Sequence, residues 1–188
     1  MRETIWLNDR SNVDLGFLVL QSSKRPGLPA TTDRTLAIPG RHGLRDFGAD
    51  LSARLFAFDC AILASDRFQL QTRVMELSAY LVDSYGRPRE LELLLAERPG
   101  QTFTVRYSGS FDIDRIQRYG KFSLPLTAYD PFARGPEQIE ELTITQSPQV
   151  ISLASGGNVR TEPVIVLRNI GGNTLPGFSL TNEYILED

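Results

Sequence analysis

The alternation of apolar and polar residues predicts a β-rich chain, with its longest strand over residues 51–62. Successive side chains of a strand point to opposite faces, so Phe56, Phe58, Cys60 and Ile62 share one apolar face. The other face is small and mixed, which is typical of a strand that packs on one side and is exposed, or contacted by another chain, on the other. A polar, glycine-punctuated loop over residues 38–50 precedes this strand.

One helix is predicted over residues 66–83, with Ser65 as the N-cap. The turn residues 86–88 (GRP) end it. Its apolar residues recur at the spacing of a single helix face, which indicates core packing. They are Leu70, Val74, Leu77 and Leu81.

Further strands are predicted over residues 3–8, 15–21, 36–39, 89–97, 101–108, 109–117, 119–129, 137–145, 150–153, 162–168 and 178–185. About a dozen strands and one helix predict a mainly β fold. We therefore expect an antiparallel β-sandwich or split-barrel N-terminal domain with a helix packed on it, followed by a partial second β domain. A composition change at residues 133–136 (ARGP) marks the boundary.

Residues 22–35 contain Pro26, Gly27 and Pro29 and almost no large apolar side chain. This segment is predicted to be an extended loop or arm, either a flexible surface loop or an arm that clasps a partner. Gly40 and Gly43 then frame a tight turn that permits positive φ angles.

The length, charge and amino-acid composition of the chain argue against several classes of function. The 188 residues suffice for one good core, or for one domain and a fragment of a second. A formal net charge of −3 argues against a general nucleic-acid binder, which needs clustered positive charge. No apolar segment is long enough to span a bilayer, and no signal-peptide pattern is present. Cys60 is the only cysteine and is predicted to be a buried, inert thiol.

No candidate catalytic, cofactor or metal site emerges. His42 is the only histidine and is predicted to face solvent in a turn. Asp112 and Asp114 share a strand face but have no further ligand in register, so we interpret them as solvated carboxylates. Neither a nucleophile elbow nor a phosphate-binding loop is present. The sequence therefore predicts a protein that is not an enzyme.

Two segments together resemble a known family. The loop IPGRHG (residues 38–43), followed by a long strand and one helix, and the ending AYDPF (residues 128–132) resemble the N-terminal domain of the siphophage distal tail protein family. The segment at residues 120–132 is similar to that domain's closing strand. Residues 162–166 and the turn at 171–173 look like the start of the family's C-terminal galectin-like sandwich.

The resemblance implies residues 1–132 as a ring-forming distal-tail-type β domain and residues 133–188 as a linker with the first strands of a partial galectin-like domain. Family members usually continue into a full second sandwich. The implied function is structural: a homo-hexameric ring at the virion tail tip, made in the host bacterial cytoplasm. Its implied partners are further copies of itself, the tail tube protein, the tail-associated hub protein and receptor-binding proteins, while DNA passes through the lumen without specific binding and no membrane is entered.

We expect a subunit or ring interface near the polar loop and the arm. Its predicted residues are Lys24, Arg25, Arg34, Arg41, His42, Arg45 and Asp46. The arm is long enough to reach a neighbouring subunit, at roughly 3.3 Å per extended residue. A modest negative charge also favours passage of DNA, because carboxylates repel phosphates.

Two alternatives stay open. One is a carbohydrate-binding β-sandwich module for host-surface glycans, suggested by the aromatic residues Tyr107, Tyr119, Tyr129 and Phe132, although their strand positions favour core packing. The other is a tail-tube-like morphogenesis protein, which would polymerise into a filament.

Overall fold

The computed structural model describes residues 2–116, 118–154 and 156–183. The chain divides into two compact units, Met1–Leu142 and Thr143–Asp188, which are described separately. Within the described residues, no helix has the length and apolar character needed to cross a membrane.

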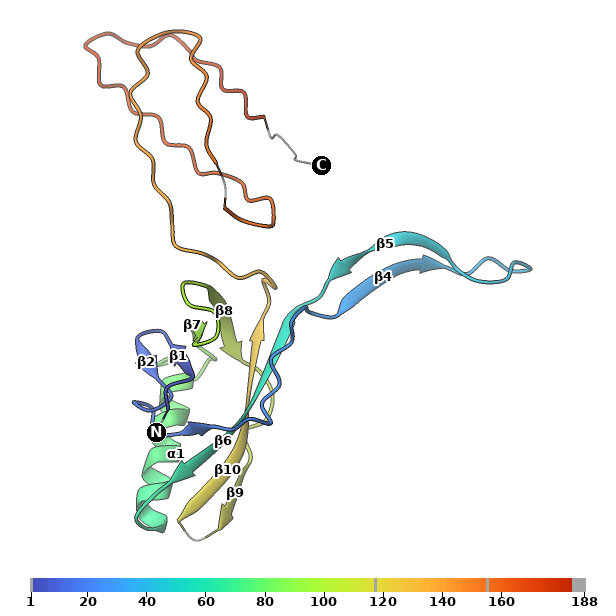
Figure 1. Cartoon of the computed structure of the whole chain (residues 1–188), viewed down its shortest axis with the longest axis vertical. Helices are drawn as coiled ribbons and strands as arrows, with labels where there is room; N and C mark the ends of the chain where they lie inside the picture. Colours follow the sequence, from blue (N-terminus) through green and yellow to red (C-terminus); the bar gives the residue numbers. More distant parts are fainter. Residues whose placement is uncertain (1, 117, 155, 184–188) are drawn as a thin grey trace. The chain divides into compact units, whose positions relative to one another are not determined.

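The first unit is built on one antiparallel sheet in the order β2-β1-β7-β8-β10-β6-β3, with β9 pairing to β10 (Figure 1). Its strands are β1 Ile5–Leu7, β2 Arg10–Ser11, β3 Leu18–Val19, β6 Arg54–Leu63, β7 Glu90–Leu95, β8 Thr102–Tyr107, β9 Ile113–Ile116 and β10 Tyr119–Ala128. The mainly antiparallel β fold with one helix is thus as predicted.

Strands β6 and β10 form the longest pairing of the sheet. Ten residues of each strand are in register without a bulge, from Tyr119 opposite Leu63 to Ala128 opposite Arg54. The strand predicted over residues 51–62 is therefore real, but it begins at Arg54. The two strands form the axis to which β3, β8 and β9 are attached.

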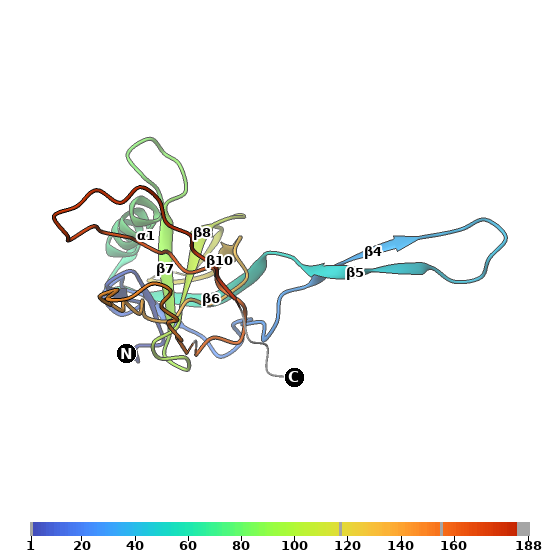
Figure 2. The ribbon, with the colours of Figure 1, turned by 90° about the horizontal axis from the view of Figure 1, so that it is seen from above.

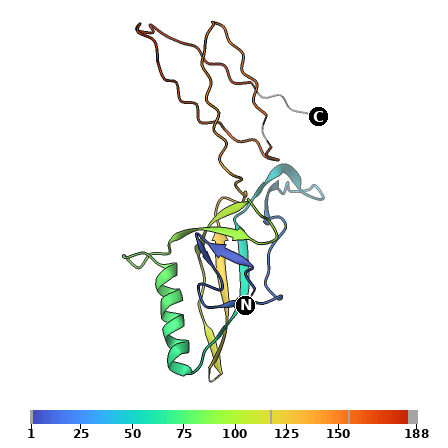
Figure 3. The same ribbon diagram turned by 60° about the vertical axis from the view of Figure 1, so that its left-hand side comes forward.

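The core lies between the sheet and the helix α1 (Arg67–Leu81), as Figure 3 shows. Phe56, Phe58, Cys60 and Ile62 on β6 are all buried, which confirms the predicted apolar face. The four residues of the predicted helix stripe are buried as well. The sequence patterns at periods of two and 3.6 therefore identify both sides of the same core.

The ends of α1 differ slightly from the prediction. Asp66, not Ser65, is the N-cap, and its carboxylate accepts hydrogen bonds from the backbone N–H groups of Phe68 and Gln69 at 2.8 and 2.9 Å. These bonds lower the pKa of Asp66, because they stabilise the charged carboxylate. An ionised acceptor at this position is favourable, since the helix N-terminus has unpaired donors and a positive dipole end.

A second, two-stranded sheet forms an arm: β4 (Thr31–Leu36), the connecting residues 37–44 and β5 (Arg45–Leu51). In Figure 2 this hairpin extends away from the main sheet. The predicted arm exists, but the interpretation of residues 22–35 and 38–50 as loops is wrong for residues 31–35 and 45–50, which pair as strands. Residues rich in Thr, Arg and Asp formed no apolar alternation from which to predict these strands.

The N-terminal strands are shorter than predicted, and β2 lies between the two segments predicted as strands, residues 3–8 and 15–21. Asn12 explains this local arrangement. Its buried side-chain oxygen accepts hydrogen bonds from the Thr4 and Ile5 N–H groups, and its amide nitrogen donates to the Phe17 carbonyl at 3.0 Å. One side chain thus ties together the segments around β1 and β3, which periodicity could not reveal.

The second unit carries no helix or strand in its described residues. The strands predicted over residues 137–145, 150–153 and 162–168 are therefore wrong, as is the described part of the strand predicted over 178–185, whose last two residues lie outside the described chain. Their apolar side chains are exposed within this unit, so alternation alone did not secure strand pairing. The proposed second β domain stays a prediction.

The packing of α1 against the sheet generates a stability prediction. Leu77 is buried in this interface, so Leu77→Ala should lower the free energy of unfolding by about 2–5 kcal/mol through lost burial and a residual cavity. Met75→Ala changes an exposed side chain of the same helix and should cost less than about 0.5 kcal/mol. Urea unfolding followed by circular dichroism compares the two variants; equal losses would contradict this packing.

Candidate functional site

The arm gathers most of the residues predicted from sequence to lie at an interface. Arg34 lies in β4, Arg41 and His42 lie in the connecting turn, and Arg45 and Asp46 begin β5. All five are exposed, and His42 faces solvent as predicted. Gly40 and Gly43 have φ angles of +76° and +82°, which confirms the predicted turn and its need for glycine.

Polar contacts across the arm hold its two strands in register. Arg34 forms an ion pair with Asp50, and the Thr32 and Ser52 hydroxyls are 2.7 Å apart. Both contacts are solvent-exposed, so each contributes little stability by itself. A register shift between Asp33 and Thr35 marks a bulge in the ladder. The arm is therefore a defined ribbon, but a weakly stabilised one.

The arm also exposes large apolar side chains that no described part of the chain covers. Leu44 and Phe47 are 65% and 59% exposed. The exposed large apolar residues of the arm are Leu36, Ile38, Leu44, Phe47 and Leu51. A two-stranded ribbon is at best marginally stable alone, and clustered exposed apolar residues mark contact surfaces. These properties favour a partner that packs on the arm.

Sequence reasoning missed these apolar contact candidates and selected the neighbouring charges instead. Leu44 and Phe47 lie in a segment predicted as a polar loop, where glycines and charges hid the strand. The signal that could have found Phe47 is its alternation with Arg45, Ala49 and Leu51, which lie on the same face of β5. Arg45 also lies over the Phe47 ring, with its guanidinium carbon 5.8 Å from the ring centre.

The segments that join the arm to the main sheet, residues 24–27 and 52–54, are called the root of the arm. The two remaining predicted residues, Lys24 and Arg25, lie in this root and make contacts within the fold. The Lys24 backbone pairs with Ala57 of β6 through hydrogen bonds of 2.7 and 3.1 Å. Arg25 forms an ion pair with Glu97 at 2.6 Å. The structure therefore does not bring these two residues together with the five on the arm.

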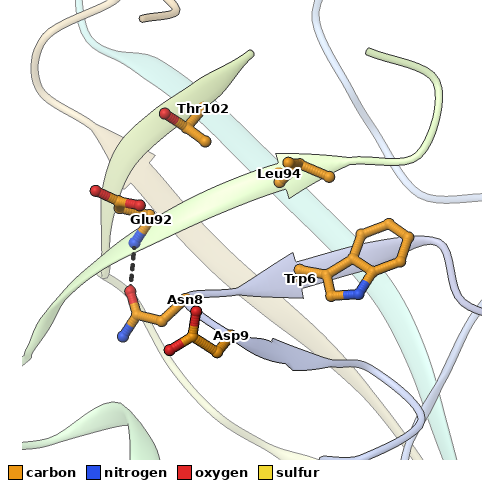
Figure 4. A pocket seen from close by; sticks show the side chains of 6 residues that line it. All are labelled: Trp6, Asn8, Asp9, Glu92, Leu94 and Thr102. Atoms are coloured by element: carbon orange, nitrogen blue, oxygen red, sulfur yellow. Dashed lines mark hydrogen bonds between the residues drawn. The ribbon is translucent and has the colours of Figure 1, made fainter. Parts of the chain in front are cut away.

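A separate recess of about 380 Å³ lies beside β1 and β7 (Figure 4). It is lined by Trp6, Asn8, Asp9, Glu92, Leu94 and Thr102. The Asn8 side-chain oxygen accepts a hydrogen bond from the Glu92 N–H at 2.8 Å, which fixes one wall of the recess. Its lining joins one large aromatic ring to several polar groups.

The described residues hold no group of three or more His, Cys, Asp or Glu side chains arranged for a metal ion. Asp112 and Asp114 are exposed, in keeping with solvated carboxylates. Cys60 is buried, and its thiol lies 3.4 Å from the Phe58 carbonyl. Burial, and secondarily the Asp59 charge, raises the pKa of the thiol well above its usual range. This sulfur is therefore poorly suited to nucleophilic chemistry.

Comparison with known families decides the class of the protein. Residues 13–128, more than half of the chain, match the model of the phage tail protein RIFT-related domain. The chain belongs to this phage tail protein family. It is a structural phage tail component and not a member of an enzyme family.

A solved structure agrees with this assignment at the level of the fold. The crystal structure of the SPP1 Dit protein, described as a paradigm of the hub adsorption apparatus in Gram-positive-infecting phages, superposes with a TM-score of 0.62 at 20% sequence identity. The similarity covers 72% of this phage tail protein and 53% of the SPP1 protein, so this chain matches about half of that protein's length. No curated protein sequence matches. The predicted resemblance to the distal tail fold is confirmed.

The buried thiol of this phage tail protein generates a chemical prediction. Native Cys60 should react with Ellman's reagent at pH 8 only on the timescale of unfolding, because the fold both hides the sulfur and disfavours its thiolate. Denaturant should release one fast-reacting thiol. As a control, Ser110→Cys places a thiol at an exposed position and should react within the mixing period. Rapid labelling of the unmodified native chain would contradict the burial of Cys60.

Proposed function

We propose that this protein is a ring-forming component of a siphophage tail tip, which joins the tail tube to the tail-tip hub and lets DNA pass through its lumen. Family membership and the Dit-like fold support a role in the tail. The ring, its hexameric number, its tube and hub partners, and contacts with receptor-binding proteins are parts of the proposal.

The observation that carries the proposal is the arm formed by β4 and β5. It is exposed along both strands, and it presents apolar side chains that cost free energy while they face water. Its seven-residue strand β5 alone spans about 23 Å at roughly 3.3 Å per residue. A segment of this length can lie across a neighbouring subunit. In a closed ring of identical chains every subunit has such a neighbour, so every arm would be covered.

The charged residues of the arm fit a role in alignment. Arg34, Arg41, His42, Arg45 and Asp46 are exposed on the same hairpin as the apolar residues, and Arg45 lies over the Phe47 ring. Charges at the rim of an interface steer association and fix register more than they add affinity. We include Lys24 and Arg25 in the proposed interface because they lie in the root, where an arm leaves its own subunit.

The net charge agrees with DNA passage. With 23 acidic and 20 basic residues, the chain lacks the positive excess that holds DNA tightly. The proposed location is the tail tip of the virion. For residues 133–188, the start of a galectin-like second domain remains our proposal.

The recess beside Trp6 favours a second candidate function, carbohydrate binding. Aromatic rings stack on sugar faces, and the neighbouring Asn8, Asp9 and Glu92 offer hydrogen-bonding groups. Of the aromatic residues selected from sequence, Tyr107 is less suitable, because it donates its hydroxyl to the Gly109 carbonyl and packs against Phe111, whereas Tyr129 and Phe132 are exposed.

Substitutions on the arm test the proposed assembly. Phe47→Ser should shift the native mass from an oligomer towards the 21.0 kDa chain, because Phe47 contributes to a partner contact. The melting temperature of its monomer should equal that of the dilute wild-type monomer, because Phe47 is not part of the core. Phe68→Ser is the matched control, since Phe68 is 70% exposed on α1, away from the arm. Light scattering after size exclusion, at two protein concentrations, gives the masses.

A charge reversal tests whether the charged residues of the arm contribute to assembly separately from its apolar residues. Arg45→Glu should weaken the oligomer at low salt, and this weakening should disappear at high salt because salt screens exposed charges. Arg115→Glu on β9 is the control and should leave the native mass unchanged. Retention of the wild-type mass by both the Phe47 and the Arg45 variants, or a wild-type monomer at every concentration, would contradict self-assembly through the arm.

The second candidate has its own test. If the recess binds sugars, a glycan array should give a signal that Trp6→Ala abolishes and Phe47→Ser leaves intact. A signal that survives Trp6→Ala would place glycan binding elsewhere and remove the recess from consideration.

A further inference from the structure

A buried arginine with incomplete hydrogen bonding lies where the arm joins the main sheet. Arg54, the first residue of β6, is only 6% exposed. One terminal nitrogen donates to the carbonyls of Pro26 and Gly27 at 3.3 and 3.2 Å. Its Nε is also buried and has no acceptor among the described residues. A buried donor without a partner is costly, so this group requires an explanation.

The surroundings of Arg54 add positive charge and no compensating carboxylate. Arg98 is close enough that, after burial itself, its charge lowers the pKa of Arg54. Arg25 lines the same cavity, and its Nε is likewise buried without an acceptor in the described part of the chain. Glu97 is the acidic residue in this group, and it is paired with Arg25. Arg25, Arg98 and Glu97 together place one net positive charge around the buried Arg54 cation.

These residues enclose a small cavity of about 20 Å³, with Phe56 and Phe103 as part of its apolar wall. The Arg54 guanidinium carbon lies 5.0 Å from the centre of the Phe103 ring, which holds the planar group in place. A cavity of this size has room for one water-sized group. The cavity therefore has room for one oxygen atom of an anion and not for a whole phosphodiester group.

We propose that Arg25, Arg54 and Arg98 form a binding site for a single carboxylate group at the root of the arm. A carboxylate oxygen in the cavity would accept from the unpartnered Nε donors, and guanidinium groups are well suited to this ligand. The carboxylate comes either from a small organic acid in solution or from an acidic side chain of a second copy of this chain. The site does not depend on the proposed ring function.

Formate is the probe, since it is the smallest carboxylate. The melting temperature of the full chain is measured at pH 7 in potassium formate and, at equal ionic strength, in the potassium salt of a bulky sulfonate that cannot enter the cavity. At a tenfold excess over its Kd, formate should raise the melting temperature by about 3–6 °C relative to the sulfonate. Arg98→Gln should reduce this difference, whereas Arg115→Gln, an equal charge change on β9, should preserve it.

Native mass in the same buffers distinguishes the two sources of the carboxylate. If a second copy supplies it, formate should compete, and both formate and Arg98→Gln should lower the oligomer mass. If a free acid occupies the site, formate should raise the melting temperature and leave the mass unchanged. Either result supports the site. The site is overturned if melting temperatures and masses are identical in formate and sulfonate and if Arg98→Gln and Arg115→Gln behave alike. This conclusion would hold even if the arm variants dissociate the oligomer.

Discussion

The ten-residue pairing of β6 with β10 is the constraint on which the rest of the first unit depends. It places Phe56, Phe58 and Ile62 on one buried face, against which α1 packs. It also provides the edges to which β3, β8 and β9 attach. A long, unbulged antiparallel pair with one apolar face is strongly specified in register, because a slip by one residue would expose the core face.

The arm derives its position from the same strand. Only Ser52 and Ala53 separate β5 from β6, so the arm continues from the most constrained strand of the sheet. Arg54 then fixes the opposite side of the root through the Pro26 and Gly27 carbonyls. A firmly held root and an exposed ribbon together suit a part that must meet a partner in a defined place. In the proposed ring, the contact made by the arm lies outside the core of the subunit, so a substitution on the arm can weaken assembly without altering the core.

The sequence predicted those elements whose stability comes from local periodicity. The α1 stripe and the buried face of β6 were identified because their apolar spacing matches a helix and a strand, respectively. The arm strands were not, because Thr, Arg and Gly in β4 and β5 face water in a single chain and carry no core pattern. Charges near the turn at residues 40–43 were assigned to an interface, whereas Phe47 was missed because its environment is set by pairing across the bulge. The second unit shows the opposite failure: alternation there predicted strands that have no pairing partner in the described residues.

The central claim is that the arm is covered by another subunit, and amide hydrogen exchange on the assembled protein tests it most directly. The exchange of backbone amides in β4 and β5 is compared between dilute chain and the isolated oligomer, with β7 and β8 as internal references. Our account predicts that the arm amides exchange quickly in the dilute chain and become strongly protected in the oligomer, while β7 and β8 change little. Arm amides that exchange equally fast in both states would contradict the claim.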